Sequence, residues 1–219
     1  ALTPVLANGP PLELMLAAVL IALCIGVPIG IASAVKRNSL LDNLGRIFAL
    51  IGVSMPNFWI GLVLILIFAK YLRLLPPSGN DSASSVILPA LALGLALSGI
   101  LMRMVRSSML EVMKEDYLKT AMAKGLSKRI IILKHAFRNA VLPVITTIAL
   151  QIGNLLGGTV VIESVFAWPG IGYFCYMRML QRDVPTIMGN LMLYAILLCA
   201  LNILTDFVYA ICDPRIRLK

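Results

Sequence analysis

Five long apolar segments divide this chain and restrict what it can fold into. They cover residues 12–35, 44–69, 86–105, 141–162 and 187–211. A helix needs about 20 mostly apolar residues to cross the hydrocarbon core of a bilayer, and each segment is about that long. Charged residues make up only 13% of the chain, about half the share in ordinary soluble domains. The pattern predicts an all-α fold, a polytopic transmembrane helix bundle, because a chain in lipid must satisfy its backbone hydrogen bonds internally.

Lysine and arginine lie between the apolar segments, and the connectors share them unequally. Of the 19 basic residues, only Lys70, Arg73, Arg178 and Arg182 belong to the second and fourth connectors. Because basic residues concentrate on the cytoplasmic side of membrane proteins, the chain is expected to start outside and to end in the cytoplasm. The same distribution argues against nucleic acid as a partner, since the net charge of +9 forms no patch interleaved with aromatic residues.

The longest polar stretch, residues 106–140, has a pattern of its own. Apolar residues recur at helical spacing around Leu118 and Ala121, and again between residues 130 and 137. Gly125 lies between the two runs and can end a helix. We therefore expect two short amphipathic helices joined by a glycine turn and displayed in the cytoplasm. Their partner could be anionic lipid, the chain's own bundle, or a groove on another protein.

Motifs for catalysis or metal binding are missing from the sequence. No G-x-x-x-x-G-K-[ST] phosphate loop occurs, so the chain itself is not expected to bind or hydrolyse ATP. The single histidine, His135, cannot form a triad or a metal site alone, and the four cysteines show no CxxC spacing. The chain is therefore predicted to have no catalytic residue, no metal site and no cofactor of its own.

Polar side chains inside the apolar segments are the remaining site candidates, because burying them in hydrocarbon is expensive. They are Asn57, Gln151, Asn154, Asn202 and Asp206. One interpretation is that they line a translocation path. The other is that they only form hydrogen bonds between helices, and both interpretations stay open.

Several motifs occur in order along nearly the whole chain. They are SMPNFW at 54–59, EDYLKTAMAKG at 115–125, HAFRNAVLP at 135–143, FAWPGIG at 166–172, RDVP at 182–185 and DPRIR at 213–217. Together they resemble the membrane subunits of ATP-binding-cassette importers, in particular the oligopeptide, dipeptide and nickel permease group. The segment at 115–125 looks like the coupling loop of that group, although Lys119 stands where the general pattern has glutamate.

The resemblance implies roles for two loops. The loop at 106–140 would seat a short helix in a cleft of a cytoplasmic ATPase, and the loop at 164–186 would face an extracytoplasmic solute-binding protein. The implied ATPase-coupling residues are Glu115, Asp116, Tyr117, Thr120, Ala121, Lys124 and Gly125. The implied binding-protein-facing residues are Glu163, Trp168, Pro169, Gly170, Arg182 and Asp183.

The resemblance also implies an assembly in a bacterial or archaeal cytoplasmic membrane. The expected partners are a second homologous permease subunit, two ATPase subunits that bind ATP and magnesium, a solute-binding protein and the lipid bilayer. A full member of the family is expected to have six spans, so we expect a first helix to precede Ala1.

A membrane subunit of an ATP-driven importer is the leading interpretation of the sequence. Peptides are narrowly preferred to nickel or a metal chelate as the substrate. A self-sufficient secondary transporter or channel would need coupling-ion or selectivity groups at the midplane, of which the chain offers few. An intramembrane enzyme would need a catalytic constellation, whereas a membrane scaffold without a transport role is compatible with the amphipathic loop.

Overall fold

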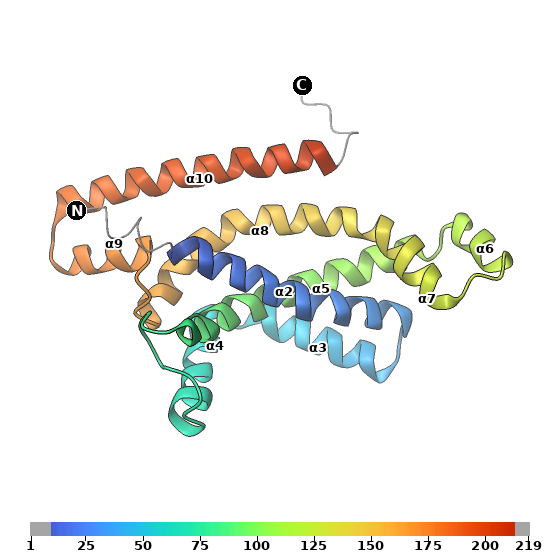
Figure 1. Cartoon of the computed structure of the whole chain (residues 1–219), viewed down its shortest axis with the longest axis horizontal. Helices are drawn as coiled ribbons and strands as arrows, with labels where there is room; N and C mark the ends of the chain where they lie inside the picture. Colours follow the sequence, from blue (N-terminus) through green and yellow to red (C-terminus); the bar gives the residue numbers. More distant parts are fainter. Residues whose placement is uncertain (1–9, 213–219) are drawn as a thin grey trace.

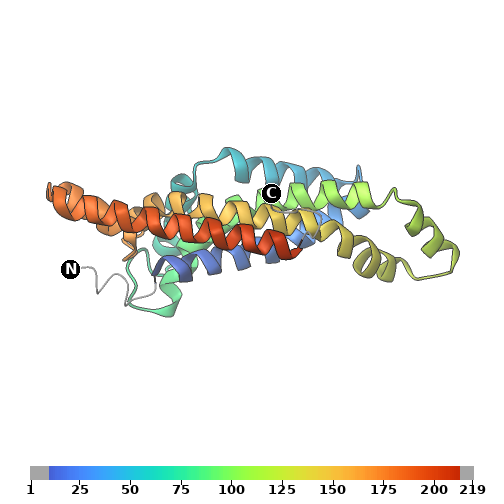
Figure 2. The ribbon, with the colours of Figure 1, turned by 90° about the horizontal axis from the view of Figure 1, so that it is seen from above.

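The computed structural model describes residues 10–212 of the backbone. Side chains are described for residues 12–203, except 153, 154 and 156–158. Within this part every regular element is helical, which confirms the all-α prediction (Figure 1). Most long helices run along one axis, and α6 (Asp116–Ala123) lies at one end of the bundle (Figure 2). We call this the loop end, and the end with α9 (Ile171–Leu180) the opposite end.

The helices follow one another with short connectors. The first are α2 (Pro10–Val35), α3 (Leu40–Ser54), α4 (Asn57–Leu64), the π-helical η1 (Ile65–Tyr71) and the 3₁₀ turn η2 (Ala83–Val86). After α5 (Ile87–Val112) and α6 come α7 (Lys128–Ile130), the π-helical η3 (Ile131–Ala136), α8 (Phe137–Val165), α9 and α10 (Val184–Cys212). Among the described residues, four helices are long and apolar enough to span a membrane, and a fifth span results if α3 and α4–η1 count as one.

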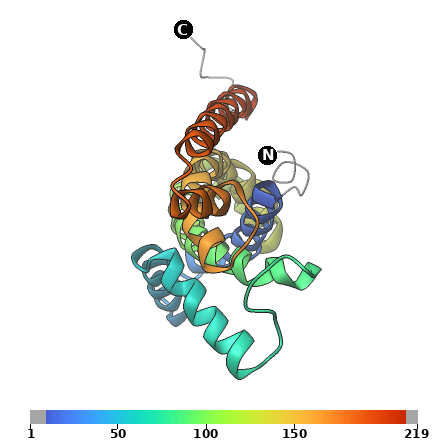
Figure 3. The same cartoon turned by 90° about the vertical axis from the view of Figure 1, so that its left-hand side faces the viewer.

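The second apolar segment is not the single helix that the sequence predicts at 44–69. Its two halves, α3 and α4–η1, meet at an angle of 106°. Pro56 causes the break, because its ring disfavours helical backbone at the preceding residue and it has no N–H to donate. Met55 is accordingly extended, with φ −87° and ψ 134°. In Figure 3, which looks along the bundle, α4 and η1 lie across the view.

Three helices, α2, α3 and α5, form a tightly packed unit that we call the inner block. Glycines let their backbones approach closely. A Cβ on Gly30 would lie 2.7 Å from the Cβ of Val105, and one on Gly99 would lie 2.9 Å from the carbonyl oxygen of Ala49. Such small-residue contacts are typical of helix pairs in membranes, where lipid supplies no hydrophobic drive for association.

The polar loop at 106–140 contains one separate short helix where the sequence predicts two. α6 is the first, and Gly125 follows it with a φ of +77°, the left-handed region that glycine adopts easily. The second is the beginning of a longer helix, since α7, η3 and α8 continue one another from Lys128 to Val165. Residues 128–140 contain neither glycine nor proline, so nothing interrupts the helix, and the π-helical turn η3 absorbs a change in its hydrogen-bond register.

α10 runs beside α8, and α9 lies at the end of α8 far from the loop end (Figure 1). Of the most apolar window of α10, only 6% is buried, whereas 67% is buried in the span that contains α5. Most of the apolar side chains in the described part of α10, Val184–Ile203, therefore face away from the chain. In a membrane such a surface contacts lipid or another subunit.

Candidate translocation pocket and coupling loop

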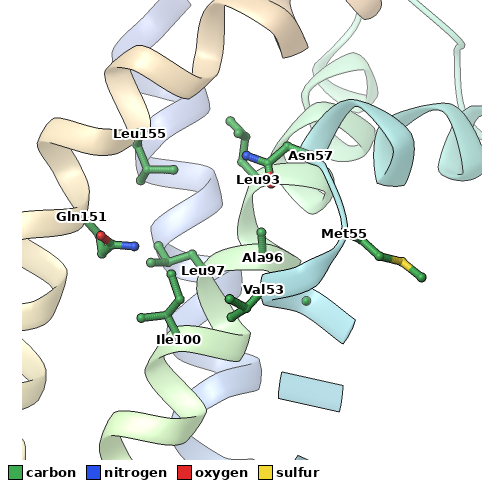
Figure 4. A pocket seen from close by; sticks show the side chains of 10 residues that line it. Val53, Met55, Asn57, Leu93, Ala96, Leu97, Ile100, Gln151 and Leu155 are labelled. Carbon is green, nitrogen blue, oxygen red and sulfur yellow. The ribbon is translucent and has the colours of Figure 1, made fainter. Parts of the chain in front are cut away.

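A pocket of about 180 Å³ lies beside the break between α3 and α4 (Figure 4). Its lining consists of Gly52, Val53, Met55 and Asn57 at the break, Leu93, Ala96, Leu97 and Ile100 on α5, and Gln151 and Leu155 on α8. Three parts of the chain supply the walls. The shape of the pocket therefore depends on how α3, α5 and α8 lie relative to one another.

Asn57 and Gln151 bring two side-chain amides to this pocket. Asn57 begins α4 and Gln151 lies on α8, and in Figure 4 the two approach from different walls. A primary amide donates and accepts hydrogen bonds and carries no charge. The pocket is therefore suited to a neutral polar group, such as a peptide bond, flanked by apolar contacts.

The other path candidates are not placed at this pocket. Asn202 is exposed on α10 and does not line it. The side chains of Asn154 and Asp206 lie outside the described residues. The structure thus brings together only two of the residues that the sequence predicts, and their role in a path stays a prediction.

At the loop end, α6 is held against the start of the α8 helix. Leu118 and Ala121 are buried, and the side-chain amide of Asn139 donates a 2.7 Å hydrogen bond to the Tyr117 hydroxyl. Ala121 thus packs against its own chain. The other residues predicted for ATPase coupling are exposed: Glu115, Asp116, Tyr117, Thr120, Lys124 and Gly125.

Apolar side chains are exposed around α6 and η3 as well. They are Met122, which is 55% exposed, Leu126, Ile130 and Leu133. Exposed basic residues lie among them, at Lys124, Lys128 and Arg129. A mixed apolar and basic helical surface of this kind is suited to binding a groove on another protein. The helical spacing in the sequence predicted the helix but not which of its apolar residues would stay uncovered.

Near the loop end lies an ion pair that the sequence does not predict. Arg106 on α5 donates two hydrogen bonds to Asp42 on α3, from Nε to Oδ1 at 2.6 Å and from Nη2 to Oδ2 at 2.9 Å. The Asp42 side chain is 0% exposed. Ser39 three residues before Asp42 is a recognisable helix-start pattern in the sequence, but that pattern does not identify Arg106 as a partner.

Glu163 at the end of α8 is buried, although the family resemblance implies that it faces a binding protein. Its Oε2 accepts the backbone N–H groups of Gly172 and Tyr173 at 2.8 and 3.0 Å, so its carboxylate caps the start of α9. A Cβ on Gly170 would overlap that carboxylate. Because the loop folds onto α8, Glu163, Trp168 and Gly170 are all buried and offer no side-chain surface to a partner.

The remaining residues of that loop differ in exposure. Arg182 is exposed and has a φ of +56°, whereas Pro169 and Asp183 are half-buried. Asp183 Oδ2 accepts a 2.6 Å hydrogen bond from the Thr186 hydroxyl, and Oδ1 accepts one from the Thr186 N–H at 3.3 Å. By accepting the Thr186 N–H, Asp183 acts as the N-cap of α10. The two hydrogen bonds also lower the pKa of Asp183, because they favour its charged form.

Sequence comparison relates the chain to membrane components of transport systems. Residues 26–218 match the family described as "Binding-protein-dependent transport system inner membrane component". The dipeptide transport system permease protein DppB of Escherichia coli K12 is 38% identical over 239 residues, covering 95% of this chain and 70% of the relative. The glutathione transport system permease protein GsiC of Salmonella paratyphi A is 42% identical over 210 residues, covering 96% and 69%.

Solved structures share the fold at lower sequence identity. The MetNI methionine ABC transporter in an inward-facing conformation matches with a TM-score of 0.78 and 18% identity, over 97% of this chain and 98% of the other. An amino acid ABC transporter solved with histidines matches with a TM-score of 0.69 and 14% identity, over 98% and 95%. The shared arrangement of helices thus extends over nearly the full length of these subunits.

Proposed function

The chain belongs to the family of binding-protein-dependent transport system inner membrane components, and from this premise we propose that it carries short peptides across the cytoplasmic membrane. As a member of this family it is a multi-pass permease subunit of an ATP-binding-cassette importer. The nature of its substrate, the composition of its assembly and its orientation in the membrane are the proposed parts.

The pocket beside the α3–α4 break carries the peptide proposal. Asn57 and Gln151 offer amide donors and acceptors on different walls, which matches the donor and acceptor of a peptide bond. The relatives described above are named for dipeptide and for glutathione, which is itself a short peptide. Neither is named for nickel, so the metal substrate that the sequence also allows has no comparable support.

The size of the pocket supports a second permease subunit. Its volume of about 180 Å³ is below the roughly 300–1,000 Å³ that is usual for small-molecule sites. A second, homologous subunit facing the same pocket would supply another wall and enlarge it. The chain would then form half of the translocation path.

The loop end is proposed to lie in the cytoplasm and to bind an ATPase. This orientation follows from the basic residues, which concentrate in the loop at 106–140 and at the C-terminus. The exposed apolar and basic surface around α6 would occupy a cleft of the ATPase, which would hydrolyse ATP with bound magnesium. The solute-binding protein would deliver substrate at the opposite end, where Arg182 is exposed.

The first experiment is to purify the full-length protein from its native membrane and to identify its partners by mass spectrometry. A second permease, two ATPases and a solute-binding protein are expected. The purified assembly in proteoliposomes should then take up a labelled dipeptide or glutathione in an ATP-dependent manner. Purification of the chain alone, with uptake driven only by an ion gradient, would instead identify a secondary transporter, and uptake of Ni²⁺ but not peptide would refute the substrate.

The pocket is tested by removing its amides. Asn57→Leu and Gln151→Leu should each raise the KM for peptide uptake about tenfold, because each leaves a polar group of the bound peptide without a hydrogen bond. Asn43→Leu is the matched control, since Asn43 is an exposed amide on α3 outside the pocket and was not predicted to line the path. Equal effects of the three substitutions would refute a peptide site at the break.

A further inference from the structure

We propose that the Asp42–Arg106 ion pair is a positioning contact for transport, because it makes α3 move together with α5 when the coupling loop moves. The inference rests on the proposed coupling role of the α6 loop. It assigns a task to two residues that lie outside the pocket lining and outside α6.

The geometry of the pair fixes the position of Arg106 relative to Asp42. Its two parallel hydrogen bonds, of 2.6 and 2.9 Å, set the orientation of the guanidinium as well as its distance from the carboxylate. The backbone N–H of Asn38 holds the same carboxylate from the start of α3 at 2.9 Å. The Asp42 side chain is fully buried and that of Arg106 is 20% exposed, and such a pair adds little net stability, because the cost of desolvating the charges offsets their attraction. The role of the pair is better explained by the two helices that it joins, α3 and α5.

The pair lies between the coupling loop and the pocket. Arg106 is within about two turns of the end of α5 at Val112, and α6 begins at Asp116. Asp42 lies in the first turn of α3, which then runs unbroken to Ser54. The break that follows lines the pocket. A displacement of α6 that reaches α5 is therefore passed through the ion pair to the pocket wall.

The half of α3 near the break is held against α5 by close backbone contacts and not by the ion pair. A Cβ on Gly99 of α5 would lie 2.9 Å from the carbonyl oxygen of Ala49, and one on Gly52 of α3 would lie 3.1 Å from that of Leu95. These backbone contacts alone would allow α3 to pivot about them. The ion pair adds a fixed point near the other end of the helix, and a helix fixed at two points must follow its neighbour.

The opposite wall of the pocket belongs to α8, which begins on the other side of the same loop. Asn57 follows α3, whereas Gln151 lies on α8, which packs against α5 and is joined to α6 by the hydrogen bond from Asn139 to Tyr117. The proposed movement is a small sliding of α3 and α5 together along α8 when the loop is displaced, with the packing between α5 and α8 kept. The two amides then separate, which releases a peptide held between them.

The test uses the complete importer in proteoliposomes, with a labelled dipeptide as the probe. Asp42→Asn and Arg106→Gln should each lower the number of peptides transported per ATP hydrolysed by about tenfold, within the usual range of coupling between two sites. The double variant should be no worse than either single one, because both remove the same contact. Arg103→Gln is the matched control, since Arg103 is exposed on the same helix.

A second measurement leaves the ion pair intact and so does not depend on how the variants fold. Spin labels replace exposed residues of a chain without its native cysteines, at Leu50 on α3, Ser107 on α5 and Leu150 on α8. Between nucleotide-free and ATP-bound importer, the distance from 50 to 107 should stay constant. The distance from 50 to 150 should change.

Three results would overturn the inference. One is an unchanged ratio of transport to ATP hydrolysis in both single variants, and another is an equal loss in Arg103→Gln. The third is a change in the distance from 50 to 107 during the cycle. These results differ from failure of the proposed function, in which the unmodified chain recruits no ATPase and takes up no peptide.

Discussion

Helix α5 of the inner block and α10 are built from similar apolar residues, but very different shares of these residues are buried. In the span that contains α5, 67% of the most apolar window is buried, against 6% in α10. In the block, Gly99 brings α5 against the backbone of α3, whereas a Cβ on Gly189 of α10 would meet no atom within 4 Å. Apolarity therefore does not distinguish a helix that packs within its chain from one that faces lipid or a partner. Small residues in contact with another backbone do distinguish them.

The largest effect should come from adding bulk at the two glycines just compared. Gly99→Val should destabilise the protein by about 3 kcal/mol, because the neighbouring group is backbone and cannot move aside. Gly189→Val on α10 should stay within about 0.5 kcal/mol. Thermal unfolding of the purified protein in detergent measures both. Equal losses of stability would show that α10 packs as tightly as the inner block.

The second largest loss of stability should be confined to the part of the molecule that contains α8 and α9. Glu163→Ala leaves the backbone N–H groups of Gly172 and Tyr173 without their acceptor, which should cost about 1–3 kcal/mol. Ser164→Ala is the control, since the Ser164 hydroxyl bonds only within its own helix, to the Val160 carbonyl.

Hydrogen exchange locates this loss of stability. We expect faster exchange in residues 166–180 and unchanged exchange in α3 and α5. Faster exchange throughout the inner block would contradict the division of the chain into two unequal parts.

The third comparison separates strain from function at two glycines outside the helices. Gly125 and Gly79 have φ values of +77° and +90°, so Gly125→Asp and Gly79→Asp should each cost about 1 kcal/mol of backbone strain. Only Gly125→Asp should uncouple ATP hydrolysis from peptide uptake, because Gly125 follows the proposed ATPase-binding helix. Equal uptake by the two variants would remove α6 from the coupling role.

The smallest effect is expected at Lys119. This residue forms an exposed 2.7 Å ion pair with Asp116 on the same helix, a kind of contact that contributes little. Lys119→Ala should leave the Tm unchanged within error. A measurable fall in Tm would show that α6 is stabilised by its surface charges and not by the burial of Leu118 and Ala121.

The helices themselves could be predicted from the sequence, because runs of about 20 apolar residues have few folds available in lipid. Pro56 in the second apolar segment is also incompatible with an undisturbed helix. The angle of 106° could not be predicted, since it depends on which contacts the two halves make after the proline separates them. The continuity of α8 with the segment before it was missed for a related reason: residues 130–137 predicted a separate short helix, yet nothing in residues 128–140 ends a helix before the span begins.

The candidate site was predicted only in part. Asn57 and Gln151 stood out because polar side chains are rare in spans, and the structure places both at one pocket. Asp42 and Arg106 are 64 residues apart, so their pairing depends on tertiary packing. The family resemblance implied that Glu163 faces a binding protein, but its partners are the backbone N–H groups of Gly172 and Tyr173, and backbone N–H groups occur in every residue type except proline.

The order of the elements along the chain has a consequence for synthesis. Every helix of the inner block lies between Pro10 and Val112, so a ribosome finishes the whole block before it begins α6. Domains generally assemble as units from the N-terminus while the chain is still being made. The later helices would then enter the bilayer beside an inner block that is already assembled. Helix α10 follows them with most of its described apolar residues uncovered, so its packing is completed only by lipid or by a neighbouring subunit.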